Sequence, residues 1–112
     1  MEIQIEPLKR CHLVKVSGRL DSASAPRLEE TLLDLVDEGV KTLVVNLSDI
    51  EFISSAGLTA LLRARIRLQK KIPPGEVILS EVPPKARETI ELVGLHHLFQ
   101  SFDTDALAIG NC

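Results

Sequence analysis

Residues 42–47 read Thr-Leu-Val-Val-Asn-Leu, a nearly continuous run of β-branched and apolar residues. An alternating strand keeps one face polar, whereas a continuous run is typical of a strand that is buried on both faces of its sheet. Strands of this kind occur in sheets that helices cover on both sides. The run therefore indicates an α/β fold.

The residues before this run predict a β-hairpin. Residues 2–6 alternate as Glu-Ile-Gln-Ile-Glu, the pattern of an edge strand with one apolar face. Residues 12–17 alternate less cleanly and end at Gly18. They predict a second strand, joined to the first by a turn around residues 7–10.

Helices and strands are expected to alternate after the hairpin. The predicted elements are a helix that follows Ser24 and stops at Gly39, the strand over 42–47, a loop over 48–55, a helix over 56–71, a strand over 76–80, a helix over 84–92, a strand over 98–102 and a short helix over 104–109. Ser24 and Asp103 are placed to cap the first and last of these helices. This order predicts a mostly parallel sheet of about five strands, the first of them an antiparallel edge, packed with about four helices.

Length and composition limit the class of protein. One domain over residues 1–112 is expected, because 45% of the residues are hydrophobic and the length suits a single core. A net charge of −3 with only three aromatic residues argues against nucleic-acid binding. No run approaches the roughly 20 apolar residues that span a bilayer, so membrane insertion is not expected. The acidic first residues are unlike a signal peptide, and Cys11 and Cys112 are expected as reduced thiols, which together favour the cytoplasm.

Serine-rich segments follow two of the predicted strands, over residues 18–24 and 48–57. Binding sites in parallel sheets lie beyond the carboxyl ends of the strands. Ser54 and Ser55 come at the start of a helix, where unpaired N–H groups and the helix dipole favour an anion. A phosphate on Ser55 would add about −1.5 to −2 charges to a neutral surface, and Gly57 would allow a close approach. The plainer interpretation is that the serines only cap the helix.

Metal binding and hydrolysis are not expected. His12, His96 and His97 have no Cys or carboxylate at ligand spacing. A serine hydrolase would need a Gly-x-Ser-x-Gly turn, and the residues before Ser55 do not form one.

The helix predicted over residues 56–71 carries a basic run, in which Arg63, Arg65 and Arg67 precede two lysines. Such a run is usually a solvated helix face, although it also suits the docking of an acidic partner. Ile66 lies among these polar residues on the helical wheel, away from the apolar face. This position makes Ile66 a candidate contact residue, although single exposed apolar residues are common.

Several short motifs occur together along nearly the whole chain. They are Val-Ser-Gly-Arg-Leu-Asp at 16–21, Asn-Leu-Ser at 46–48, Phe-Ile at 52–53, Ser-Ser-Ala-Gly-Leu at 54–58, Leu-Val-Gly-Leu at 92–95 and Phe99. In this order they resemble the motifs of STAS domains, and of bacterial anti-sigma-factor antagonists in particular. The resemblance implies a STAS-type α/β fold and a protein-binding module that is not an enzyme and needs no cofactor.

By this resemblance, Ser55 matches the serine that an anti-sigma factor with serine kinase activity phosphorylates. The unphosphorylated antagonist is expected to capture that kinase and free a sigma factor, and a PP2C-type phosphatase is expected to reset the phosphorylated form. The residues expected to contact the partner lie in the two serine-rich segments and the following helix: Asp21, Ser22, Ser24, Ser54, Ser55, Ala56, Gly57, Leu58 and Ile66.

Two positions depart from the family pattern. Asn46 stands where Asp is common, and Ser54 stands where Asp usually precedes the acceptor serine. Two carboxylates are therefore expected to be missing around the site, and Ser54 becomes a second candidate acceptor. These departures keep open a second hypothesis, in which the chain is a non-phosphorylated STAS subunit of a lipid-transport ABC complex or of a signalling assembly. A small-molecule sensor is disfavoured because the chain has no Gly-rich phosphate loop, and homodimer formation stays open.

Overall fold

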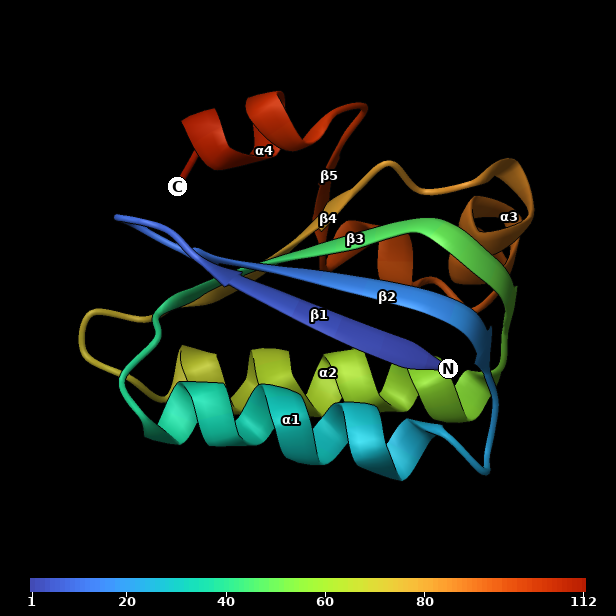
Figure 1. Ribbon diagram of the computed structural model, residues 1–112, viewed down its shortest axis with the longest axis horizontal. Coiled ribbons are helices and arrows are strands. Elements are labelled where there is room, and N and C mark those ends of the chain that lie inside the picture. The colour runs from blue at the N-terminus through green and yellow to red at the C-terminus, as the bar shows by residue number, and fades with distance from the viewer.

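A five-stranded sheet in the order β1–β2–β3–β4–β5 runs through the computed structural model, which describes residues 1–112 (Figure 1). The strands are β1 (Glu2–Pro7), β2 (His12–Leu20), β3 (Thr42–Ile53), β4 (Glu76–Ser80) and β5 (Gln100–Phe102). β1 pairs antiparallel with β2, and every other pair of neighbouring strands is parallel. The predicted sheet is therefore confirmed, with an antiparallel strand at its edge.

The helices lie on both faces of this sheet. They are α1 (Ala25–Asp37), α2 (Ser55–Gln69), α3 (Pro84–Leu92) and α4 (Asp105–Gly110), with a short 3-10 helix η1 (Leu95–His97) after α3. α1 and α2 lie side by side against one face, α4 lies over the opposite face, and α3 lies beside the end of β3 (Figure 1). None of these helices combines the length and the apolar character that crossing a bilayer requires.

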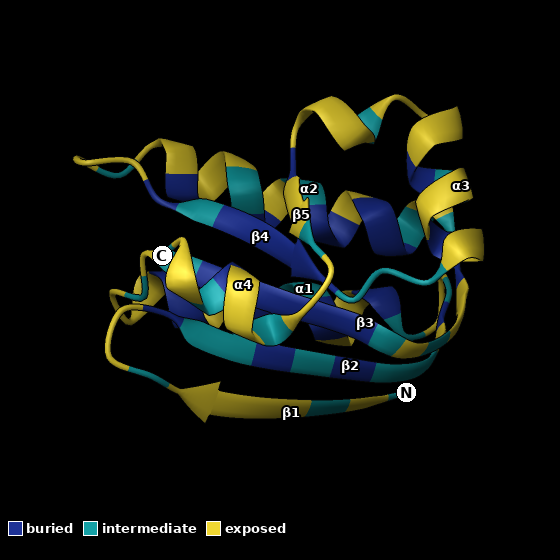
Figure 2. Ribbon diagram, turned by 90° about the horizontal axis from the view of Figure 1, so that it is seen from above, coloured by how far each residue is buried: buried dark blue, intermediate teal, exposed yellow.

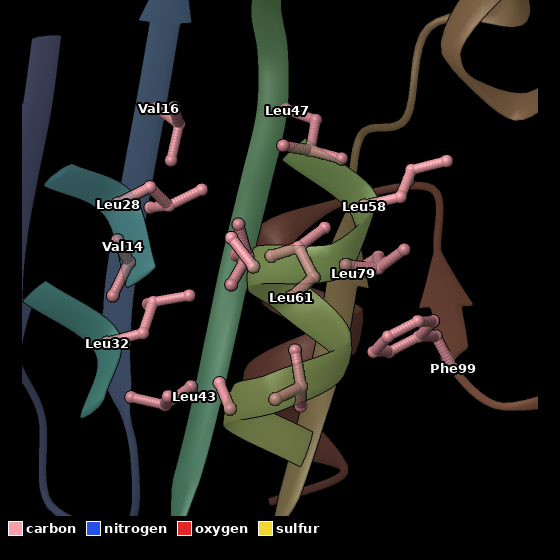
Figure 3. Packing of buried hydrophobic residues seen from close by; sticks show 14 of the residues in the cluster. Val14, Val16, Leu28, Leu32, Leu43, Leu47, Leu58, Leu61, Leu79 and Phe99 are labelled. Carbon is pink, nitrogen blue, oxygen red and sulfur yellow. The ribbon is translucent and has the colours of Figure 1, made fainter. Parts of the chain in front are cut away.

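The main hydrophobic core fills the space between the sheet and the pair α1–α2 (Figure 3). Strand residues such as Val14 and Leu43 meet Leu32 of α1 and Leu61 of α2 there. On the other face of the sheet, Val44 packs in a smaller cluster under α4. β3 is therefore buried on both faces, as its sequence predicts, and each fully buried aliphatic side chain contributes about 1.5–3 kcal/mol.

The loop predicted over residues 48–55 is wrong, because β3 continues to Ile53. Its last residues pair with the end of β2, so that Leu20 lies opposite Ile53. β2 also passes Gly18, whose φ of +89° accompanies a shift in the register of the two strands. The pairing satisfies backbone groups of residues 48–53, where three polar and three apolar side chains are mixed. The continuous apolar run that predicted the strand therefore ends before this segment.

Two expectations near the C-terminus are also wrong. The strand predicted over residues 98–102 contains only Gln100–Phe102, because the preceding chain turns through η1. Thr104 caps α4 instead of Asp103, since the Thr104 hydroxyl accepts a hydrogen bond from the N–H of Leu107 at 3.2 Å. A threonine oxygen at this position satisfies one of the unpaired N–H groups of the first turn.

Candidate functional site

The carboxyl ends of β2 and β3 bring the two serine-rich segments together. β2 leads into the loop before α1, and β3 leads directly into α2. The N–H of Ser54 donates to the carbonyl oxygen of Leu20 at 2.9 Å, which ties the start of α2 to the end of β2. Both segments therefore share the edge of the sheet at which parallel α/β folds place their sites.

Gly57 allows α2 to start this close to β2. A Cβ atom added at Gly57 would lie 2.5 Å from Cγ of Leu20 and 3.1 Å from its carbonyl oxygen. These distances are shorter than van der Waals contact, so any larger residue would push the helix start away from the strand. Gly57 and its neighbour Leu58 are both buried, and they support the surface from beneath.

Ser54 and Ser55 have different roles in the start of α2. Ser54 is the half-buried N-cap residue, and its hydroxyl accepts a hydrogen bond from the N–H of Gly57 at 3.3 Å. Ser55 is the first residue of the helix and is exposed. Its carbonyl oxygen accepts from the hydroxyl of Thr59 at 2.9 Å, but its own hydroxyl makes no hydrogen bond within the chain. The Ser55 hydroxyl is therefore free to meet a partner or an enzyme.

The loop between β2 and α1 is held in shape by Asp21 and Ser24. One carboxylate oxygen of Asp21 accepts from the N–H groups of Ala23 at 3.0 Å and Ser24 at 3.1 Å. The hydrogen bond from the Ser24 N–H is the main cause that lowers the pKa of Asp21 below its ordinary value, and the positive charge of Arg19 adds to it. Asp21 therefore stays ionised at neutral pH. Ser22 lies exposed in the same loop.

Ser24 is at the N-cap position of α1, but its side chain does not cap the helix as predicted. Its hydroxyl donates to the carbonyl oxygen of Arg19 at 2.8 Å and accepts from the N–H of Asp21 at 3.0 Å. These two hydrogen bonds close the loop, and they take the place of a hydrogen bond between the hydroxyl and the first turn of α1.

A groove runs between α1 and α2 from this edge of the sheet. Its first part has a volume of about 370 Å³ and is lined by Ser22, Ala25, Pro26, Glu29, Ala56, Thr59 and Arg63. Its second part has a volume of about 280 Å³ and is lined by Glu29, Leu33, Arg63, Ile66, Arg67 and Lys70. The two parts share Glu29 and Arg63, so the groove links the neighbourhood of Ser55 to Ile66, which is 45% exposed.

The arginines of α2 are largely engaged within the chain. Arg63 lies 3.0 Å from Glu29, and Arg67 lies 3.0 Å from Asp37. Arg65 donates to the carbonyl oxygen of Leu98 at 2.9 Å. The basic run predicted from sequence therefore ties α2 to its neighbours. The acidic partners on α1 were not identified from the sequence, because they become neighbours only when the two helices pack.

The side chain of Asn46 lies away from the surface around Ser55. The expectation that Asn46 leaves a carboxylate missing beside Ser55 is therefore wrong. Its amide nitrogen donates to Asp105 at 2.8 Å and to Glu81 at 3.1 Å, and its oxygen accepts from the N–H of Ser48 at 2.8 Å. Asn46 is 2% exposed. These contacts place its side chain under α4, on the face of the sheet opposite α1 and α2.

A second hollow was not anticipated from the sequence. It has a volume of about 510 Å³ and lies between the end of β3 and α3, lined by Ile50, Glu51, Phe52, Ile53, Pro83, Pro84, Lys85, Ala86 and Thr89. Phe52 is partly exposed there, and the guanidinium of Arg19 lies 4.5 Å from the centre of its ring. The Phe-Ile motif was the one available signal. No group of three or more His, Cys, Asp or Glu side chains is arranged to hold a metal ion.

Comparisons with known sequences agree with this architecture. The family model described as the STAS domain matches residues 2–108. BtrV of Bordetella bronchiseptica, which is named as an anti-sigma factor antagonist, is 31% identical over 99 residues, covering 88% of this chain and 84% of that protein. RsfB of Mycobacterium tuberculosis, an anti-sigma-F factor antagonist, is 32% identical over 97 residues, covering 85% of this chain and 77% of that protein.

Solved structures show the same fold. An anti-sigma factor antagonist from Mycobacterium paratuberculosis superposes with a TM-score of 0.85 at 28% identity, over 98% of this chain and 92% of that one. The anti-sigma factor antagonist SpoIIAA of Bacillus, in its unphosphorylated form, has a TM-score of 0.77 at 22% identity, over 98% of this chain and 96% of that one. SpoIIAA has also been solved in its phosphorylated form.

Proposed function

The chain belongs to the STAS domain family, and from this premise we propose that it is an anti-sigma-factor antagonist switched by phosphorylation of Ser55. In its unphosphorylated form it would bind an anti-sigma factor with serine kinase activity and so release a sigma factor. The observation that carries this proposal is the Ser55 hydroxyl, which is exposed and without a partner at the first residue of α2.

Ser55 is a better acceptor than Ser54 because its hydroxyl has no structural task. The Ser54 oxygen accepts from the Gly57 N–H and is half-buried, so a kinase would have to break the cap to reach it. Losing an N-cap costs about 1 kcal/mol. Modification of Ser55 leaves that cap in place, which supports Ser55 as the site.

The switch would act through charge at a docking surface. The first turn of α2 offers unpaired N–H groups and the positive end of the helix dipole, so a phosphate on Ser55 would be tolerated by the free protein. A partner packed over the bare serine would instead have to desolvate a dianion, which is costly without a paired cation. Phosphorylation would therefore release the partner, and a PP2C-type phosphatase would restore binding.

The partner would contact both segments at this edge and continue along the α1–α2 groove. Asp21, Ser22 and Ser24 lie in the loop before α1, and Ser55 and Ala56 begin α2. Ser22 and Ala56 line the first part of the groove, and Ile66 lines the second. Gly57 and Leu58 would contribute by holding the helix start in place. SpoIIAA, which shares the fold, is a protein that exists in phosphorylated and unphosphorylated forms, and this supports the comparison.

Intact-mass measurement with the cognate anti-sigma kinase and ATP tests the proposal. The wild-type chain should gain about 80 Da, the mass of one phosphoryl group. Ser55→Ala should gain nothing, while the matched control Ser54→Ala should still be modified. If Ser55→Ala is modified as readily as wild type, Ser55 is not the acceptor. If the wild type is never modified and instead co-purifies with a transporter ATPase, the constitutive-subunit hypothesis replaces this one.

A further inference from the structure

The two cysteines of the chain meet on the sheet face opposite the proposed switch. Cys11 closes the turn between β1 and β2, where its carbonyl oxygen accepts from the N–H of Leu8 at 2.9 Å. Cys112 follows α4 at the other end of the described chain. The C-terminus lies beside the β1–β2 turn in both views of the molecule (Figures 1 and 2).

Both side chains belong to the small apolar cluster under α4. Cys11 is buried there with Val44, Ile78 and Ala108, and Cys112 packs against the cluster. The sulfur of Cys112 is 3.5 Å from the carbonyl oxygen of Ala108, a member of the same cluster. The fold thus brings into one small cluster two thiols that are far apart in the sequence.

Two thiols gathered in one small cluster have few chemical uses. A zinc or iron site would need further ligands, and no third His, Cys, Asp or Glu joins the pair. Neither sulfur is placed to serve the surface around Ser55, which lies across the sheet. Oxidation to a disulfide is the reaction that needs both sulfurs and nothing else from the protein.

We propose that Cys11 and Cys112 are a redox-modified pair, which a low-molecular-weight disulfide such as oxidised glutathione converts to an intramolecular disulfide. The Cys112 thiol loses its proton and its sulfur attacks one sulfur of the oxidant, releasing the first glutathione thiol and leaving a mixed disulfide. The Cys11 sulfur then attacks that mixed disulfide at Cys112, losing its own proton and releasing the second glutathione thiol. Two protein thiols are oxidised and one glutathione disulfide is reduced.

The surroundings set the order and the speed of these steps. Cys11 is 3% exposed, whereas Cys112 is only half-buried, so the oxidant reaches Cys112 first. Burial is the main cause that raises the pKa of Cys112, and the neighbouring Cys11 thiol adds to it. A thiol with a raised pKa forms little thiolate at neutral pH, so the first step is slow. The second step is faster, because both cysteines pack at one small cluster and the reaction is intramolecular.

The disulfide would fasten one end of α4. The other end is already held by Asp105, which accepts hydrogen bonds from Asn46 at 2.8 Å and from Ser80. A bond that closes a long loop restricts the unfolded chain most, so the oxidised form should be more stable. Because α4 and α2 lie on opposite faces of the sheet, oxidation should leave the modification of Ser55 unchanged (Figure 1).

Oxidation of the purified wild-type chain tests this inference independently of any kinase. After incubation with oxidised glutathione, the intact mass under non-reducing conditions should fall by about 2 Da, and thiol titration should find no free thiol. A peptide map should contain the linked Cys11 and Cys112 peptides. The melting temperature of the oxidised form should exceed that of the same sample after reduction.

Two variants separate the pair from a single reactive cysteine. Cys11→Ser should retain glutathione on Cys112 as a stable mixed disulfide, whereas Cys112→Ser should leave the buried Cys11 unmodified. The inference is overturned if oxidised wild type retains glutathione, forms disulfide-linked dimers or keeps two free thiols. It is also overturned if the internal disulfide forms but lowers the melting temperature, since the sulfurs would then not be positioned by the native fold.

Discussion

Ser54 and Ser55 are adjacent in sequence, yet the start of α2 assigns them different tasks. Ser54→Ala removes the oxygen that accepts from the Gly57 N–H, so it should destabilise the protein by about 1 kcal/mol. Ser55→Ala removes a hydroxyl without a partner and should change stability by less than about 0.5 kcal/mol. Urea unfolding of both variants measures the difference. A larger loss for Ser55→Ala than for Ser54→Ala would contradict the assignment of cap and acceptor.

The hydrogen bonds to Asp21 predict how the stability of the protein depends on pH. Its folded-state pKa is lowered below the ordinary value of 3.8, first by the hydrogen bond from the Ser24 N–H. A lowered carboxyl pKa contributes stability above the unfolded-state pKa, and this contribution is lost as the pH falls through the folded-state value. The loss should therefore appear below pH 3.8. An NMR titration of the Asp21 carboxyl should give a midpoint below that of an unfolded peptide, and Asp21→Asn should abolish the corresponding step in stability. A midpoint at or above the peptide value would contradict the loop geometry.

At the scale of elements, the contact between α2 and β2 depends on Gly57. Gly57→Ala should destabilise the protein by about 1–3 kcal/mol, because its Cβ would lie 2.5 Å from Cγ of Leu20. Helix propensity alone predicts the opposite sign, since alanine favours a helix over glycine by about 1 kcal/mol. Gly110→Ala is the matched control, because nothing lies within 4 Å of the added Cβ. Equal effects of the two substitutions on unfolding would show that the close approach does not matter.

Elements with a clear apolar pattern in the sequence were predicted well. Features that depend on pairing between distant segments were not. The apolar run over residues 42–47 predicted a strand buried on both faces, and Leu43 and Val44 do pack on opposite faces. The extension of β3 to Ile53 was missed because the continuous apolar run ends at Leu47, and residues 48–53 are held in the sheet by backbone pairing with β2. Likewise the start of α2 was placed within a residue, whereas its link to Leu20 depends on a contact between distant segments.

For the molecule as a whole, the sheet separates two surfaces with different chemistry. The α1–α2 face carries the groove and Ser55, while the α4 face carries the amide of Asn46 between Glu81 and Asp105. The family pattern suggested that Asn46 lies near Ser55. However, the register and twist of the assembled sheet decide on which face a strand residue lies. The sequence therefore predicted that the two serine-rich segments share one edge of the sheet, but not on which face Asn46 lies.

Asn46→Asp tests this separation. The new carboxyl would lie beside two others in a buried position, so its pKa would be raised above the unfolded-state value. A raised carboxyl pKa costs stability as the pH rises, and the deficit should be about 1–3 kcal/mol at neutral pH and shrink as the pH falls toward the unfolded-state pKa. Unfolding at several pH values measures it, with the rate of Ser55 phosphorylation as a second readout that should not change. A slower phosphorylation in a fully folded variant would mean that the two faces are coupled.

The affinity of the partner kinase for the two forms of this chain tests the central claim most directly. Isothermal titration should compare unmodified protein with protein carrying one phosphate on Ser55. We predict that the phosphate weakens binding at least about tenfold, because the interface would have to desolvate a dianion at the start of α2. Equal affinity for the two forms, with Ser55 verified as fully phosphorylated, would contradict the account.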